Sequence, residues 1–157
     1  MKKLLFALFS LTLFISCVNS EKDTPIEPAK DYTAQNEQEI KDYITKNNLT
    51  AQRTDSGLYY IIDEPGTGKQ PTATSSVTVA YTGSFTSGKT FDQSSSAGIT
   101  FPLNQVIQGW TEGIPLFKEG GKGTLLIPAH LGYGSYDRQG IPAGSVLIFD
   151  VKLIKVN

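Results

Sequence analysis

The chain contains few of the side chains on which most enzyme chemistry depends. Its 157 residues include one cysteine, Cys17, and one histidine, His130. One cysteine excludes an intramolecular disulfide and a cysteine-based metal site. A single histidine without a GxSxG element argues against a Ser-His-Asp triad or a multi-histidine metal centre. We therefore expect no metal and no cofactor.

The chain also lacks an excess of positive charge. Fourteen Lys and Arg side chains nearly balance 15 Asp and Glu side chains, which gives a net charge of −1. Proteins that bind nucleic acid usually carry a strongly basic patch, so we expect no nucleic-acid partner. With few charged catalytic candidates and many aromatic residues, the composition favours a site that acts through shape and the exclusion of water.

Residues 1–16 contain the longest hydrophobic run and predict a signal peptide. A short positive start is followed by an apolar segment from Leu4 to Ile15, too short to span a bilayer comfortably but typical of a signal-peptide core. Ser16-Cys17 then resembles a bacterial lipobox. This resemblance implies a lipid anchor at Cys17 and a location in the bacterial cell envelope, facing the periplasm or the cell surface. An ordinary cleaved signal peptide with an unrelated cysteine is the alternative.

The next two segments connect this N-terminus to a folded domain. Residues 17–35 are polar, contain two prolines and have no apolar periodicity, which predicts a flexible linker. Residues 36–55 predict a short N-terminal helix and its connection. Asn36 has the pattern of a helix cap, with Glu39 at the capping-box position, and three apolar residues then share one face: Ile40, Tyr43 and Ile44. Residues 56–157 would form one domain.

That domain has the pattern of short strands around one helix. Val77, Val79 and Tyr81 alternate with other residues, as in a strand with one buried face. The spacing of Trp110, Ile114 and Phe117 is helical, which places the indole at or just inside the start of a short helix. Strands are predicted at 57–62, 76–82, 90–92, 99–103, 122–128 and 145–156. Closely spaced strands with one central helix predict an antiparallel α+β domain.

The segment Gly83–Thr90 matches the phosphate-loop pattern GxxxxGK[ST] residue for residue. Such a loop must open a helix, because the helix N-terminus supplies the amides that hold the phosphates. The residues after Thr90 form a serine-rich stretch without helical periodicity, and Asp150, which could otherwise hold magnesium, lies inside a continuous strand pattern. We therefore predict that no nucleotide binds here.

Five blocks of the domain resemble the FKBP family of peptidyl-prolyl isomerases, in the family's order. The blocks are Tyr81-Thr82-Gly83, Gly88-Lys89-Thr90-Phe91-Asp92, Val106-Ile107-Gln108-Gly109-Trp110-Thr111-Glu112-Gly113, Leu131-Gly132-Tyr133-Gly134 and Ile141-Pro142 with Ser145 to Val151. The match covers roughly residues 57–156. It implies a twisted antiparallel half-barrel β-sheet wrapped around one short α-helix, with a pocket between the two.

The resemblance also implies a role for individual residues. Trp110 would form the floor of a pocket for the proline ring, and Asp92 and Tyr133 would supply polar contacts. The Tyr133 hydroxyl and the Ile107 backbone amide would reach substrate carbonyls. Apolar walls and rims would come from Tyr81, Phe91, Ile99, Val106, Ile107, Ile141 and Phe149. For Val106 and Phe149, packing in the core is an equally open interpretation.

The function implied by the resemblance is peptidyl-prolyl cis-trans isomerisation of X–Pro bonds in exported proteins. The partners would be proline-containing polypeptides and, as inhibitors, macrolides; the chain would be a monomer. The stretch between Phe91 and Phe101 is shorter than in well-known eukaryotic members, which leaves substrate preference and inhibitor affinity open. The alternative is a non-catalytic chaperone that holds proline segments in the same pocket.

Overall fold

The computed structural model describes residues 29–138 and 140–157. The predicted signal peptide, the lipidation site Cys17 and most of the predicted linker lie outside these residues. Within the described part of the chain, no helix is both long and apolar enough to cross a membrane.

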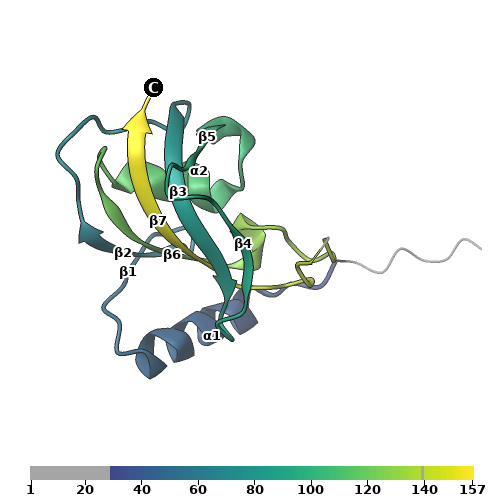
Figure 1. Ribbon diagram of the computed structural model, residues 1–157. Helices are drawn as coiled ribbons and strands as arrows, with labels where there is room; N and C mark the ends of the chain where they lie inside the picture. The colour runs from purple at the N-terminus through teal and green to yellow at the C-terminus, as the bar shows by residue number, and fades with distance from the viewer. Residues whose placement is uncertain (1–28, 139) are drawn as a thin grey trace, which may run out of the picture.

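A single antiparallel sheet forms the body of the protein. Its strands run in the order β1-β2-β6-β7-β3-β4, and β5 also pairs with β3. Their bounds are β1 (Gln52–Arg53), β2 (Tyr59–Glu64), β3 (Ser76–Phe85), β4 (Thr90–Gln93), β5 (Ile99–Pro102), β6 (Lys122–Ile127) and β7 (Leu147–Val156). The two long strands, β3 and β7, curve side by side over the short helix α2 (Gln108–Gly113) (Figure 1). The predicted α+β class, an antiparallel sheet around a short helix, is confirmed.

The strand β3 is central because it pairs on both sides. Its whole length runs along β7, while its other edge pairs first with β5 and then with β4. The alternation noted in the sequence is preserved: Val77 and Val79 are fully buried on the face that α2 covers. The final strand, β7, begins at Leu147, two residues later than predicted. Gly144, with a φ of +72°, and the hydrogen bond from Ser145 N to Pro142 O keep the preceding residues in a turn.

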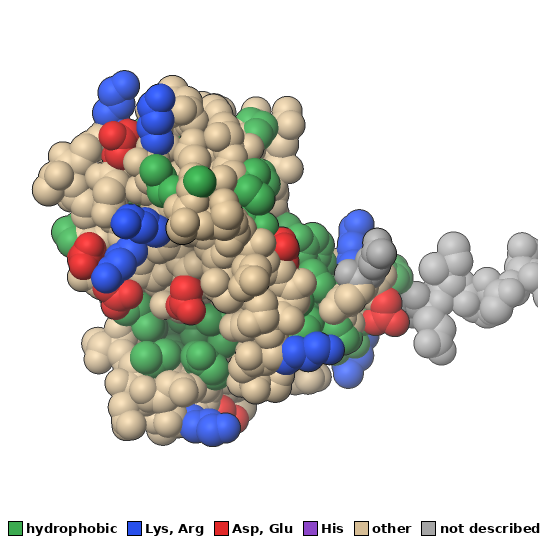
Figure 2. All heavy atoms as spheres, in the orientation of Figure 1, with side chains coloured by type: hydrophobic (Ala, Val, Ile, Leu, Met, Phe, Trp, Pro, Cys, Tyr) green, Lys and Arg blue, Asp and Glu red, His purple; other side chains and the backbone are tan. Residues whose placement is uncertain are grey.

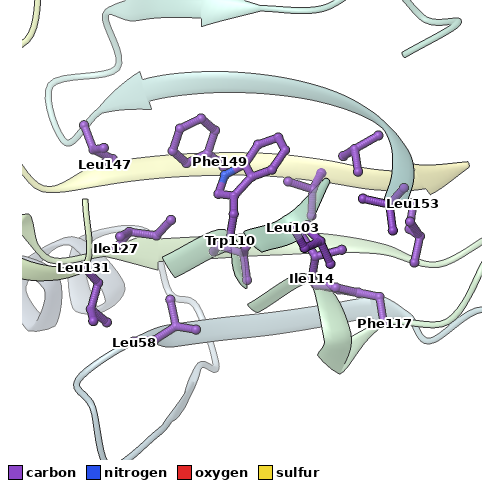
Figure 3. Packing of buried hydrophobic residues seen from close by; sticks show 14 of the residues in the cluster. Leu58, Leu103, Trp110, Ile114, Phe117, Ile127, Leu131, Leu147, Phe149 and Leu153 are labelled. Carbon is purple, nitrogen blue, oxygen red and sulfur yellow. The ribbon is translucent and has the colours of Figure 1, made fainter. Parts of the chain in front are cut away.

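The helix α2 packs unusually close to the sheet. It lies between two short 3₁₀ turns, η1 (Leu103–Gln105) and η2 (Ile114–Leu116). A Cβ added at Gly109 would lie 2.5 Å from Ile127, and one at Gly113 would lie 2.7 Å from Leu125. Both glycines therefore let the helix approach β6. Figure 3 shows the indole of Trp110 pointing from this helix toward Phe149 on β7.

A second helix, α1 (Thr33–Lys46), packs against a separate hydrophobic cluster. Ile40 is fully buried there, together with Tyr59, Leu126 and Val146. Strand neighbours alternate between the two faces of a sheet, and Leu125 belongs to the main core whereas Leu126 belongs to this cluster. The sheet therefore has α2 on one face and α1 against the other.

The predicted start of α1 is wrong. The helix begins at Thr33, inside the segment assigned to the linker, and Tyr32 is its N-terminal flanking residue. Asn36 lies one turn inside the helix with its side chain fully buried. Glu39 does not close a capping box, because its carboxylate accepts a hydrogen bond from the hydroxyl of Thr86 at 2.6 Å. Both polar side chains have distant partners that a local pattern cannot reveal.

The segment with the phosphate-loop pattern forms a β-hairpin. Gly83 to Phe85 end β3, and Thr90 begins β4, so a strand follows the loop where nucleotide binding would need a helix. Asp150 lies within β7 and accepts a hydrogen bond from the Thr124 hydroxyl at 2.8 Å. On the face shown in Figure 2, acidic and basic side chains are interspersed.

Candidate active site

The side chain of Trp110 forms a floor with aromatic walls around it. Tyr81, Phe101 and Phe149 have ring centroids 5.1, 5.5 and 5.3 Å from the indole, at interplanar angles of 87°, 85° and 82°. Edge-to-face geometry is favourable for aromatic pairs. Because all three rings stand nearly perpendicular to the indole, none of them is stacked parallel to it.

An open cavity of about 480 Å³ lies at this cluster. Predicted site residues contribute most of its lining: Tyr81, Phe91, Asp92, Val106, Ile107, Trp110, Tyr133 and Phe149. They come from β3, β4, the turn before α2, α2 itself, the segment after η3 (Ala129–Leu131), and β7. The fold thus brings together residues that are up to 68 positions apart between Tyr81 and Phe149.

Two polar side chains in the lining are linked. The hydroxyl of Tyr81 donates a hydrogen bond to Oδ2 of Asp92 at 2.7 Å. The other carboxylate oxygen of Asp92 accepts the backbone N–H of Gln93 at 2.8 Å. Burial raises the pKa of Tyr81 well above its usual value, and the hydrogen bond to Asp92 and its negative charge raise that pKa further. Tyr81 therefore remains a neutral hydrogen-bond donor at physiological pH and holds the Asp92 carboxylate in place.

The indole N–H of Trp110 is buried and has no hydrogen-bond partner among the described residues. A buried donor without a partner costs free energy, and most buried tryptophans find one. The residue is otherwise 4% exposed and packed by aromatic rings. The floor of the cavity is thus an indole whose N–H is enclosed by protein and unpaired among the described residues.

The structure places two predicted residues outside the cavity. Ile99 begins the edge strand β5 and is 44% exposed, whereas Phe101, two residues later on the same face, does line the cavity. Ile141 is buried in the main core. Its backbone pairs with that of Arg138, and Arg138 is the residue that lines the cavity.

Four lining residues were not predicted from the sequence: Phe101, Gln105, Gly132 and Arg138. Phe101 could have been found, because it alternates with Ile99 in a segment predicted to be extended. No pattern marks Gln105 or Arg138, which lie in turns. Among the described residues, no group of three or more His, Cys, Asp or Glu side chains could hold a metal ion.

Comparison with known proteins identifies the family. The family model of the FKBP-type peptidyl-prolyl cis-trans isomerases matches residues 67–154. The chain belongs to this family. The matched FKBP-type segment contains every residue that lines the cavity.

Curated FKBP-type relatives are longer than this chain. The FKBP-type peptidyl-prolyl cis-trans isomerase FkpA of Aeromonas hydrophila is 43% identical over 126 residues, which cover 78% of this chain and 47% of the relative. FkpA of Escherichia coli is 39% identical over 151 residues, which cover 94% of this chain and 55% of the relative. The chain therefore spans about half the length of these relatives.

Solved structures share the FKBP-type fold. The crystal structure of FkpA from Escherichia coli matches with a TM-score of 0.71 and 40% identity, covering 80% of this chain and 61% of that chain. A peptidyl-prolyl cis-trans isomerase from Pseudomonas syringae matches with a TM-score of 0.69 and 28% identity, covering 83% of this chain and 99% of that chain.

Proposed function

We propose that this protein accelerates cis-trans rotation of X–Pro bonds in polypeptides, with the proline ring bound on the indole of Trp110. The observation that carries the proposal is the set of three rings standing perpendicular to the indole around an open cavity. A proline ring is compact, apolar and small enough for such a space. Family membership supports the same activity.

The chemistry requires no nucleophile. Rotation about a peptide bond costs about 18–20 kcal/mol because resonance must be broken, and an X–Pro bond exchanges isomers over roughly tens to hundreds of seconds unaided. In the rotated transition state the carbonyl oxygen carries less charge and needs water less. An apolar cavity therefore destabilises the planar ground state more than the twisted one, and such differential binding lowers the barrier.

Polar groups at the rim would add to this difference. The backbone N–H of Ile107 precedes α2 and has no hydrogen-bond partner among the described residues, so it is free to donate to a substrate carbonyl. The Tyr133 hydroxyl lies in the same lining on a side chain that is 37% exposed. Donors fixed before the substrate binds cost little reorganisation in the transition state.

A protease-coupled proline-peptide assay on the purified protein tests the proposal. Trp110→Ala should lower kcat/KM by at least about tenfold, which corresponds to about 1.4 kcal/mol of lost transition-state stabilisation. Tyr60→Phe is a matched aromatic control, because its hydroxyl bonds to Gln52 at 2.7 Å and the residue lies outside the cavity. Negligible activity in the unaltered protein, combined with suppression of client aggregation, would favour the chaperone alternative.

The cellular setting of this activity is part of the proposal. We place the protein in the bacterial cell envelope, acting as a monomer on exported polypeptides and held to a membrane through lipid on Cys17. Mass spectrometry of the mature N-terminus tests the anchor, and light scattering tests the monomer. Binding of macrolide inhibitors in the same cavity can be measured by competition with the peptide substrate.

A further inference from the structure

The side chain of Asn36 makes a pair of buried hydrogen bonds far from its position in the sequence. Asn36 is fully buried, and it is the only polar or charged residue that is buried in the described part of the chain. Its Nδ2 donates to the carbonyl oxygen of Gly144 at 2.8 Å, and its Oδ1 accepts the backbone N–H of Ala129 at 2.9 Å. One amide therefore uses both its donor and its acceptor on backbone groups more than 90 residues away.

These two backbone groups are the ends of one segment at the cavity. The described residues 129–138 and 140–144 follow β6 and precede β7, and they supply Tyr133 and Arg138 to the lining. Its ends are also joined through Gly134, whose N–H donates to Ala129 O at 2.8 Å and whose carbonyl accepts Gly144 N–H at 3.0 Å. Asn36 adds a further link between Ala129 and Gly144, and this link comes from outside the segment.

The residues before α1 strengthen the contact. A Cβ added at Gly144 would clash with the ring of Tyr32, so the ring packs directly on the backbone there. The hydroxyl of Ser135 also donates to the carbonyl oxygen of Lys30 at 2.6 Å. The chain from Lys30 to Asn36 thus contacts the segment at both its middle and its end.

The same helix reaches the opposite side of the cavity. Glu39 accepts the hydroxyl of Thr86 at 2.6 Å, in the turn between β3 and β4. The strand β4 carries Phe91 and Asp92 to the lining. Although no residue of α1 lines the cavity, the helix contacts both segments that flank it.

We propose that Asn36 is a positioning residue that holds Tyr133 and Arg138 at the rim of the cavity. The inference rests on the proposed isomerase function. Loops of this kind open locally at low free-energy cost, and a segment whose two ends are fixed keeps its side chains in a narrower range of positions. Removal of the amide would leave a buried donor and a buried acceptor without partners, and the segment would open to satisfy them with water.

The kinetic test compares two variants of the same helix. Asn36→Ala should lower kcat/KM for a proline peptide about fivefold to tenfold, mainly through a lower kcat, because Tyr133 would no longer be fixed for the rotated carbonyl. Ile40→Val is the matched control: Ile40 is also fully buried on α1 but makes no bond to the segment. It should lower the denaturation midpoint while leaving both kinetic constants within about twofold.

A double-mutant cycle separates positioning from general loss of stability. In a Tyr133→Phe background, Asn36→Ala should cost less in kcat/KM than in the unaltered protein, because the Tyr133 hydroxyl that it positions has already been removed. Its effect on the denaturation midpoint should be the same in both backgrounds. Full and additive kinetic losses in the two backgrounds would overturn the proposal.

Hydrogen exchange gives a readout that does not depend on activity. Asn36→Ala should accelerate exchange at the amides of Ala129 and Gly144, with amides in β7 unchanged. If Asn36→Ala does not fold, Tyr32→Ala serves instead, since Tyr32 is only half-buried and packs on the same glycine. If the unaltered protein were inactive but exchange were faster in the variant, the proposed isomerase function would be refuted. The role of Asn36 in holding the segment would still stand. An active protein with unchanged exchange and kinetics in the variant would refute the positioning role alone.

Discussion

Gly83 and Phe91 are in such close contact that a Cβ added at Gly83 would lie 2.7 Å from the Phe91 ring. The same Cβ would lie 2.9 Å from the ring of Phe149. These two rings meet edge to face, with centroids 5.5 Å apart. Because Gly83 has no side chain, the rings of Phe91 and Phe149, which line the cavity, can pack against each other over β3.

Gly83→Ala should move Phe91 into the cavity. We expect it to destabilise the fold by about 1–3 kcal/mol through overpacking and to raise KM, because the space for proline becomes smaller. Gly88→Ala is a control in the same hairpin: its φ is +84°, but a Cβ there would meet nothing within 4 Å. The control should lose stability without a change in KM. Peptide kinetics and urea denaturation measure both effects, and an unchanged KM for Gly83→Ala would contradict the assignment of Phe91 to the wall.

The hydrogen bond from Tyr81 to Asp92 gives a second prediction. Tyr81→Phe keeps the ring that stands on the indole but leaves the Asp92 carboxylate without its hydroxyl donor. We expect kcat/KM to fall by about threefold to tenfold, the equivalent of one typical hydrogen bond of about 1 kcal/mol. Tyr60→Phe, whose lost bond lies away from the cavity, should keep its kinetics within about twofold. Equal losses of kcat/KM in Tyr81→Phe and Tyr60→Phe would mean that the bond to Asp92 has no specific part in the activity.

The resemblance to the FKBP family predicted most of the cavity residues, and local patterns independently support two of them. Tyr81 continues the two-residue alternation of β3, and Trp110 lies on the helical spacing that begins α2. Ile99 was placed in the wall by resemblance, but the cavity extends along this face of β5 only as far as Phe101. Local rules fix which face a residue occupies; they do not fix how far along the strand the cavity extends.

The role of Asn36 could not be read from the sequence for a different reason. A helix cap and a buried amide have the same residue type and similar neighbours. They differ only in tertiary partners, here Ala129 and Gly144. Arg138 could not be assigned to the cavity from the sequence either. Its backbone pairs with that of Ile141, and the side chain of Ile141 lies in the core while Arg138 lines the cavity.

The raised pKa of Tyr81 predicts a loss of stability in alkali. Its phenol has an unfolded-state pKa of about 10, and the folded-state pKa is higher, chiefly because of burial and then because of Asp92. The protonated form is therefore favoured by folding, and this contribution is fully present below about pH 10. As the pH rises from there toward the folded-state pKa, the unfolded chain ionises first and stability falls.

Urea denaturation at about pH 8 and about pH 10.5 measures this contribution. The unaltered protein should lose more stability between the two pH values than Tyr81→Phe does, since the variant lacks the group. Other tyrosines are present in both proteins and cancel in the comparison. If the two proteins lost the same stability, the Tyr81 phenol would not be buried and bonded to Asp92 in the way that raises its pKa.

The approach of α2 to β6 gives the last prediction. In an isolated helix, alanine in place of glycine would be favourable by about 1 kcal/mol. At Gly109, however, the added Cβ would lie 2.5 Å from Cγ2 and 2.8 Å from Cδ1 of Ile127, and Ile127 is fully buried. Overpacking of this kind costs about 1–3 kcal/mol, so Gly109→Ala should be destabilising on balance and should tilt the helix that carries Trp110.

A compensating variant distinguishes this contact from a simple effect on the helix. Ile127→Ala should by itself destabilise the protein by about 2–5 kcal/mol, because it leaves a cavity in the core. Combined with Gly109→Ala, it should cost less than the sum of the two, since the new methyl group enters the space that the isoleucine vacates. Tryptophan fluorescence and kcat/KM should recover together in the double variant, because both depend on where α2 holds the indole. Strict additivity would show that the close approach of Gly109 to Ile127 does not set the position of the cavity floor.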